Sequence, residues 1–101
     1  MKYKITREQL ERIIPKLEKA LFDYFSDDDR ICGFKIYDAY DEDSVKYDRD
    51  LIDVYVIFNH DWATTDEWAT LRSGVIRDKV REHLKNIFPF NFGVYSYAKK
   101  C

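Results

Sequence analysis

Cysteine, glycine and proline are scarce in this 101-residue sequence, which contains two, three and two of them respectively. So little glycine and proline excludes collagen-like and low-complexity chains. Two cysteines without a CxxC pair indicate no disulfide framework. No apolar segment follows the charged N-terminus, so no export signal is visible, and we expect a cytoplasmic protein, in a host cell if it is viral. In that reducing compartment we expect Cys32 to pack as a small hydrophobic residue and Cys101 to be a mobile terminal thiol.

Long apolar runs and an excess of basic charge are also missing. The longest apolar run, residues 54–58, is far shorter than the roughly 20 residues that span a bilayer, so we expect no membrane partner. With 17 basic and 19 acidic residues the net charge is −2, which argues against a nucleic-acid partner. What the chain does have is 46% hydrophobic and 17% aromatic residues. Its length and composition predict a single domain over residues 1–101.

The N-terminal third carries the clearest helix signal. Thr6 and Gln9 form a capping box, in which each side chain can bond to the other residue's backbone amide. An apolar series at helical spacing follows, and it predicts a helix over residues 6–25. Pro15 lies inside this segment, where it should kink the helix or restart it.

The rest of the chain alternates between strand and helix patterns. Period-two alternation predicts strands over residues 31–39 and 51–59, joined by a polar connection that has room for a short helix. A second capping box, Thr-Thr-Asp-Glu at residues 64–67, predicts the start of a helix that ends near residue 86. Residues 90–97 alternate again and form the last strand.

These elements predict an α+β fold with the order α-β-β-α-β. The economical assembly is a three-stranded sheet, mixed or antiparallel, with both helices packed on one face. The first two strands are expected to be antiparallel neighbours, and the helix before the last strand permits a parallel crossover.

The sheet face that points away from both helices would be rich in tyrosine. Large apolar patches mark contact sites, and tyrosine is favoured at interfaces because it joins an apolar ring to a polar hydroxyl. We therefore predict contact with a second copy of the chain or with another protein; alternatively, the connection at 40–50 or the N-terminal arm folds over this face. Asp53 shares the face, and its charge disfavours nucleic acid. The predicted contact residues are Tyr37, Leu51, Tyr55, Ile57, Tyr95 and Tyr97.

A second apolar patch, outside the core-facing stripe, is predicted on the C-terminal helix. Trp68, Leu71 and Val75 form a stripe that lies more than about 100° around the helix from the core-facing stripe. Either the N-terminal helix buries this patch, or it is a second contact surface. Two contact surfaces would suit a ring or a multi-protein assembly.

Acidic side chains concentrate in the middle of the chain. Residues 23–61 contain 12 acidic and four basic residues. Such a belt can steer a basic partner or orient a second copy, and it can also be a solvated surface that keeps the chain soluble. The acidic stretch at 38–53 lacks the glycine and the final glutamate of an EF-hand loop. We therefore expect no metal and no other cofactor, with a divalent-cation site in that stretch as the open alternative.

Residues 34–58 resemble the minimal nucleotidyltransferases. In that family a helix and a strand lead to a Gly-Ser turn, and the next strand opens with an Asp-hydrophobic-Asp motif. A helix and a strand with a third carboxylate follow. Residues 51–58, Leu-Ile-Asp-Val-Tyr-Val-Ile-Phe, are similar to that second strand, and the order of elements over residues 6–98 is similar too.

Several positions depart from the pattern of that family. Leu51 stands where the first metal-binding aspartate belongs, and Asp50 is one residue away, on the other face of the strand. Tyr-Asp-Ala at 37–39 replaces the Gly-Ser turn, and no carboxylate in residues 89–101 can serve as the third ligand. Two-metal phosphoryl transfer needs its carboxylates on one side of the metals. The resemblance therefore implies a degenerate relative that binds metal or nucleotide.

A second resemblance covers the N-terminal helix. The segment Ile-Thr-Arg-Glu-Gln-Leu-Glu-Arg-Ile-Ile at residues 5–14 is similar to the short capped helix of many small tailed-phage proteins. It implies a viral protein with a structural or host-modulating role. Taken with the tyrosine-rich face, it favours a non-catalytic protein that acts by protein–protein contact, and we predict no catalytic residues.

Overall fold

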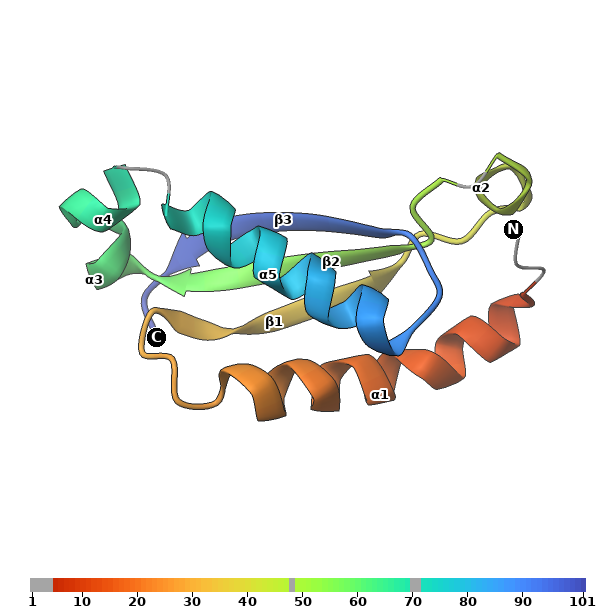
Figure 1. Cartoon of the computed structure of the whole chain (residues 1–101), viewed down its shortest axis with the longest axis horizontal. Coiled ribbons are helices and arrows are strands. Elements are labelled where there is room, and N and C mark those ends of the chain that lie inside the picture. Colours follow the sequence, from red (N-terminus) through yellow and green to blue (C-terminus); the bar gives the residue numbers. More distant parts are fainter. Residues whose placement is uncertain (1–4, 48, 70–71) are drawn as a thin grey trace.

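A three-stranded mixed sheet organises the part of the chain that the structure describes. The computed structural model describes residues 5–47, 49–69 and 72–101. In it β2 (Ile52–Asn59) lies between β1 (Ile31–Asp38), its antiparallel neighbour, and β3 (Phe92–Lys99), its parallel neighbour (Figure 1). The α+β class is confirmed, and of the two predicted sheet types the mixed one is present.

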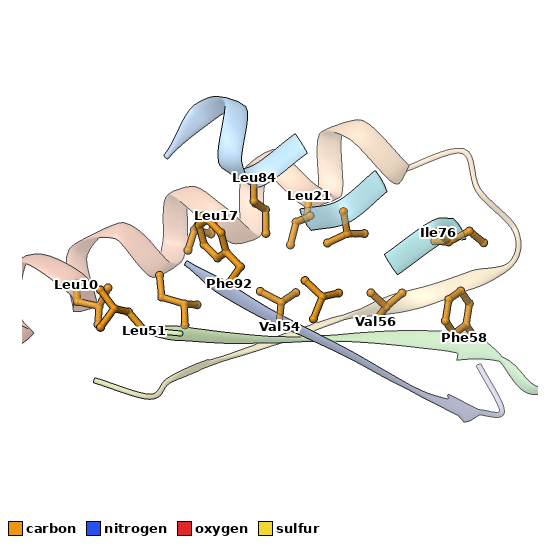
Figure 2. Packing of buried hydrophobic residues seen from close by; sticks show 13 residues of the cluster. Leu10, Leu17, Leu21, Leu51, Val54, Val56, Phe58, Ile76, Leu84 and Phe92 are labelled. Atoms are coloured by element: carbon orange, nitrogen blue, oxygen red, sulfur yellow. The ribbon is translucent and has the colours of Figure 1, made fainter. Parts of the chain in front are cut away.

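Two long helices cover the same face of this sheet. α1 (Arg7–Phe25) and α5 (Arg72–Ile87) both lie above the strands in Figure 2, as the hydrophobic spacing predicts. Each helix contributes a stripe of buried aliphatic side chains, and each strand contributes alternate residues to the same layer. The fully or almost fully buried residues of this core include Leu10, Leu17, Leu21, Ile52, Val54, Val56, Phe58, Ile76, Val80, Leu84, Phe92 and Val94.

The α1 helix begins as predicted and continues through its proline. The Thr6 hydroxyl accepts a hydrogen bond from the Gln9 amide, and the Gln9 side chain accepts one from the Thr6 amide. The helix does not restart at Pro15. Pro15 is exposed, whereas Leu10 and Leu17 on either side of it are buried, so contact with the core holds both halves of the helix in one element.

The helix predicted over residues 64–86 corresponds to α4 (Asp66–Ala69) and α5 in the structure. α4 begins directly after Thr65, close to the predicted start, and residues 70 and 71 between the two helices lie outside the described residues. A short helix that the sequence did not predict, α3 (His60–Ala63), precedes them. Thr64 and Thr65 donate their hydroxyl hydrogens to the carbonyls of Asp61 and Trp62 and so close α3.

The connection between β1 and β2 contains the short helix for which the sequence left room. α2 (Glu42–Lys46) begins after Asp41, whose carboxylate accepts a hydrogen bond from the Ser44 amide. Val45 packs against the helix-side core. The connection therefore lies at the end of the sheet, where Figure 1 shows it.

The expectation of two free thiols is wrong, because Cys32 and Cys101 form a disulfide with their Cα atoms 5.5 Å apart. The register of β1 against β2 shifts between Ile31 and Gly33, which makes Cys32 the extra residue of a bulge. A bulge re-aims the side chain it carries, so the alternating pattern could not place this thiol. Lys99 pairs with Asn59 on β2, and the last two residues cross from there to β1.

The disulfide gives a stability prediction. Replacing Cys101 by serine should lower the free energy of unfolding by up to about 4 kcal/mol, because a bridge that closes a long loop restricts the unfolded chain. Urea unfolding of the oxidised wild type and of Cys101→Ser measures the difference, and the reduced wild type should match the variant. Equal unfolding midpoints for the oxidised chain and the variant would contradict the pairing.

Candidate functional site

The reverse face of the sheet gathers four tyrosines around the central strand. Tyr55 on β2 has Tyr95 as its register partner on β3, and Tyr97 lies two residues further along β3, opposite Ile57. Tyr37 on β1 lies opposite Asp53. We call this surface the tyrosine face and define it by the residues Tyr37, Asp53, Tyr55, Ile57, Tyr95 and Tyr97.

The tyrosine rings touch one another but remain open to solvent. The ring of Tyr55 lies 5.5 Å from that of Tyr37, 5.3 Å from that of Tyr95 and 6.2 Å from that of Tyr97, measured between centroids. These separations are within the range in which aromatic pairs stabilise each other. Tyr37 is 51% exposed and Tyr95 is 45% exposed. The ring of Tyr55 thus contacts three other rings, and Tyr37 and Tyr95 remain about half exposed to solvent.

Neither helix nor the β1–β2 connection covers the tyrosine face within the described residues. α1 and α5 pack on the opposite side, and Val45 of the connection joins the helix-side core. Ile5, the first described residue of the N-terminal arm, packs against that core as well. The described part of the connection therefore does not fold over the tyrosines, whereas residues 1–4 of the N-terminal arm, the other segment predicted as a possible cover, lie outside the described residues.

Two of the predicted contact residues, Leu51 and Ile57, are almost fully buried, and Leu51 also lies on the other side of the sheet from the one expected. Leu51 is 6% exposed and packs in the helix-side core, so it does not belong to the tyrosine face. It precedes the first residue of β2, and the alternation that placed it holds only within the strand. Ile57 does lie on the tyrosine face by register, but it is only 7% exposed and offers little contact area.

Two carboxylates converge beside the tyrosines, at Gly93. A Cβ atom added at Gly93 would lie 2.8 Å from Asp53 Oδ1, 2.9 Å from Asp50 Oδ2 and 3.0 Å from Tyr95 Cε2. These atoms fill the space that a larger residue would need, which explains a glycine inside a strand. The prediction that Asp50 points to the other face is wrong, because Asp50 also precedes β2 and escapes its alternation.

Few favourable interactions offset the negative charge of these two carboxylates. Burial, and secondly the like charge of Asp50, raise the pKa of the Asp53 carboxyl above its ordinary value. The charge of Asp53, followed by burial and by the charge of Asp50, raises the pKa of the Tyr95 phenol. Among the described residues, the ion pairs involve other aspartates, namely Asp28, Asp38 and Asp78. The tyrosine face thus carries negative charge without a described cation bonded to it.

The structure describes two of the three residues of the second predicted patch, Trp68 and Val75. Trp68 packs against Phe58 and Trp62, with ring centroids 5.4 Å and 5.6 Å away, at the end of the sheet. Val75 is exposed on α5, and Leu71 lies outside the described residues. Trp68 is therefore covered, by residues that follow or end β2 rather than by α1.

A groove of about 500 Å³ runs between α1 and the edge strand β1. Phe22, Phe25 and Phe34 are among its mostly apolar lining residues. Its charged lining residues, Glu18 and Lys19, are of opposite sign, unlike the two carboxylates at Gly93. Within residues 5–47, 49–69 and 72–101, no three His, Cys, Asp or Glu side chains gather as a metal site. Across the same residues, every helix is too short or too polar to cross a membrane.

No protein-family model matches this sequence, and comparison with curated proteins and with solved structures finds no match. Function must therefore be argued from the tyrosine face itself.

The raised pKa of Asp53 gives a pH prediction. A carboxyl whose pKa is raised on folding contributes stability at low pH that is lost as pH rises through its folded pKa. Asp53→Asn removes the ionisation, so it should raise the melting temperature by a few degrees at about pH 7 and leave it unchanged at about pH 3. Calorimetric melting of both proteins across this range measures the effect.

Asp28→Asn is the matched control with the opposite sign. The hydrogen bond from Arg30 is the main reason why the pKa of Asp28 is lowered. Its loss should lower the melting temperature at about pH 7, and the difference should fade as pH falls through the pKa of Asp28. An Asp53→Asn variant that is less stable than wild type at neutral pH would contradict the uncompensated charge.

Proposed function

We propose that this chain is a non-catalytic protein that acts by protein–protein contact through the tyrosine face. The observation that carries the proposal is the exposure of Tyr37 and Tyr95 on a sheet face that neither long helix covers. Interface cores are enriched in tyrosine, and contiguous aromatic surface on a single chain marks a contact site.

The composition of the face fits an interface. Its centre is aromatic and already packed, because the ring of Tyr55 contacts three other tyrosines. Its border is charged, with Lys35 on β1 and the Asp50–Asp53 pair beside β3. An aromatic centre with a polar rim is the arrangement in which a few residues supply most of the binding energy.

Two occupants fit this proposal, a second copy of the chain and another protein. The acidic belt at residues 23–61 would orient either one and raise the rate of encounter with a basic surface. The resemblance of residues 5–14 to tailed-phage proteins suggests a structural or host-modulating role.

A second candidate is a degenerate nucleotidyltransferase-like domain that binds metal or nucleotide. The specific observation in its favour is the approach of Asp50 and Asp53 at Gly93, which brings two carboxylates to one side of β2. Against catalysis, β3 has no carboxylate between Phe92 and Lys99 to complete a two-metal set. Contact with a protein accounts for the tyrosines as well as the aspartates, so we prefer it.

Light scattering tests self-association through the tyrosine face. The double variant Tyr55→Ser/Tyr95→Ser should remain monomeric at concentrations at which the wild type forms a dimer or larger oligomer, because it loses the central rings of the contact. Tyr47→Ser is the matched control, since Tyr47 is exposed but lies in the β1–β2 connection. It should keep the wild-type mass.

A wild-type chain that is monomeric at every concentration would rule out a second copy as the occupant. An oligomer that persists in Tyr55→Ser/Tyr95→Ser would place the self-contact elsewhere and contradict the role of this face. Light scattering of the chain alone does not test contact with a different protein, which needs a probe of that partner's chemistry.

A further inference from the structure

We propose that the tyrosine face receives an arginine side chain of another protein, whose guanidinium bonds to Asp50 and Asp53 beside the ring of Tyr95. The inference rests on the proposed function and names the chemistry of the partner.

A cation would stabilise the pair of carboxylates formed by Asp50 and Asp53. Asp50 Oδ2 and Asp53 Oδ1 lie 2.9 Å and 2.8 Å from the same point above Gly93, so a single guanidinium can donate to both. No described side chain forms an ion pair with either carboxylate. Like charges held this close repel each other, and an arriving cation relieves that repulsion as well as gaining its own attraction.

The surrounding rings favour a planar cation. The partly exposed residues Tyr37 and Tyr95 both contact Tyr55, and a guanidinium can stack on tyrosine rings while its edge donates hydrogen bonds. A lysine ammonium offers a point charge without this planar fit. The aspartates and tyrosines together therefore select arginine.

The same fold already binds arginine with this combination of groups at two other places. Arg7 lies over the ring of Tyr40 at 5.4 Å from its centroid, and its guanidinium pairs with Asp38 at 3.4 Å.

The second internal example has the same chemistry. Arg30 lies 5.8 Å from the ring centroid of Trp62 and pairs with Asp28 at 2.7 Å. At the tyrosine face, two aspartates likewise lie beside an aromatic ring, and an arginine of a partner would complete the same arrangement.

The charges on the face favour another protein over a second copy. By register, the basic residues that share the tyrosine face among the described strands are Lys35 and Lys99. Arg81 on α5 acts electrostatically on Tyr95, but its guanidinium already pairs with Asp78 at 3.3 Å. Two copies packed face to face would therefore offer each other the lysines of the strands. A partner with an exposed arginine matches both the charge and the shape of the site.

A matched pair of peptides tests the inference on the full, oxidised chain. One probe is a blocked pentapeptide with a single arginine between alanine and glycine residues, and the other replaces that arginine with citrulline, its neutral isostere. Backbone amide resonances of the isotope-labelled chain report binding. The arginine peptide should shift the Gly93 and Tyr95 resonances along a saturable curve, and the citrulline peptide should bind at least about ten-fold more weakly, a difference of about 1.4 kcal/mol.

Three variants locate the binding. Asp50→Asn and Asp53→Asn should each weaken the arginine peptide several-fold, with Asp53→Asn remaining folded because it removes an uncompensated charge. Asp23→Asn makes the same change of charge on α1 and should bind like the wild type. Raising the salt concentration should weaken binding to the wild type more than to Asp53→Asn.

The possible results separate the inference from the proposed function. Equal binding of both peptides, lost in Tyr55→Ser/Tyr95→Ser, would overturn the choice of arginine while supporting a contact face. A shift of the Gly93 resonance by Mg²⁺ but not by the arginine peptide would overturn it in favour of the metal-binding alternative. The absence of any shift with the arginine peptide would also overturn it, and the mass of the wild-type chain and its variants would decide self-contact separately.

Discussion

The structure depends on the fact that both long helices cover one side of a three-stranded sheet. A parallel pair such as β2 and β3 needs a crossover, and the segment from α3 to α5 provides it. α1 packs beside α5 on the same layer. The buried aliphatic stripes of both helices are thus used on one side of the sheet, although Phe22, Tyr24, Val75 and Ile87 of these helices remain exposed. The opposite face of the sheet must be either a polar, solvated surface or a surface that a partner covers. Its tyrosines make it too aromatic for a plain solvated surface.

The uncovered side also holds groups that do not help the fold. Asp50 and Asp53 approach each other over Gly93, and the pKa of Asp53 is raised by burial and by that proximity. Elsewhere the chain pairs Asp28 and Asp38 with arginines. A protein under selection for stability alone would not keep an uncompensated pair where neutral residues would serve, whereas a binding surface has reason to keep it. The aspartates and the tyrosines therefore support the same proposal.

The sequence predicted the elements whose signals are local and regular. The capping box of α1 and the alternation within β2 were enough to place both helices on one face and the tyrosines on the other. Prediction failed where a residue lies just outside a regular element or interrupts it. Alternation does not extend to Asp50 and Leu51, which precede β2, and a bulge redirects the thiol of Cys32. The short helix α3, which Thr64 and Thr65 close, has too few residues to give a periodic signal.

The central claim is that the tyrosine face is open in the single chain. Hydroxyl-radical footprinting read by mass spectrometry measures this directly, at a concentration at which the chain is monomeric. Tyr37 and Tyr95 should be oxidised at rates close to that of Tyr47, which is 58% exposed. Strong protection of Tyr37 and Tyr95 in the monomer would mean that the chain covers this face itself, and the account of an interface built on these rings would be wrong.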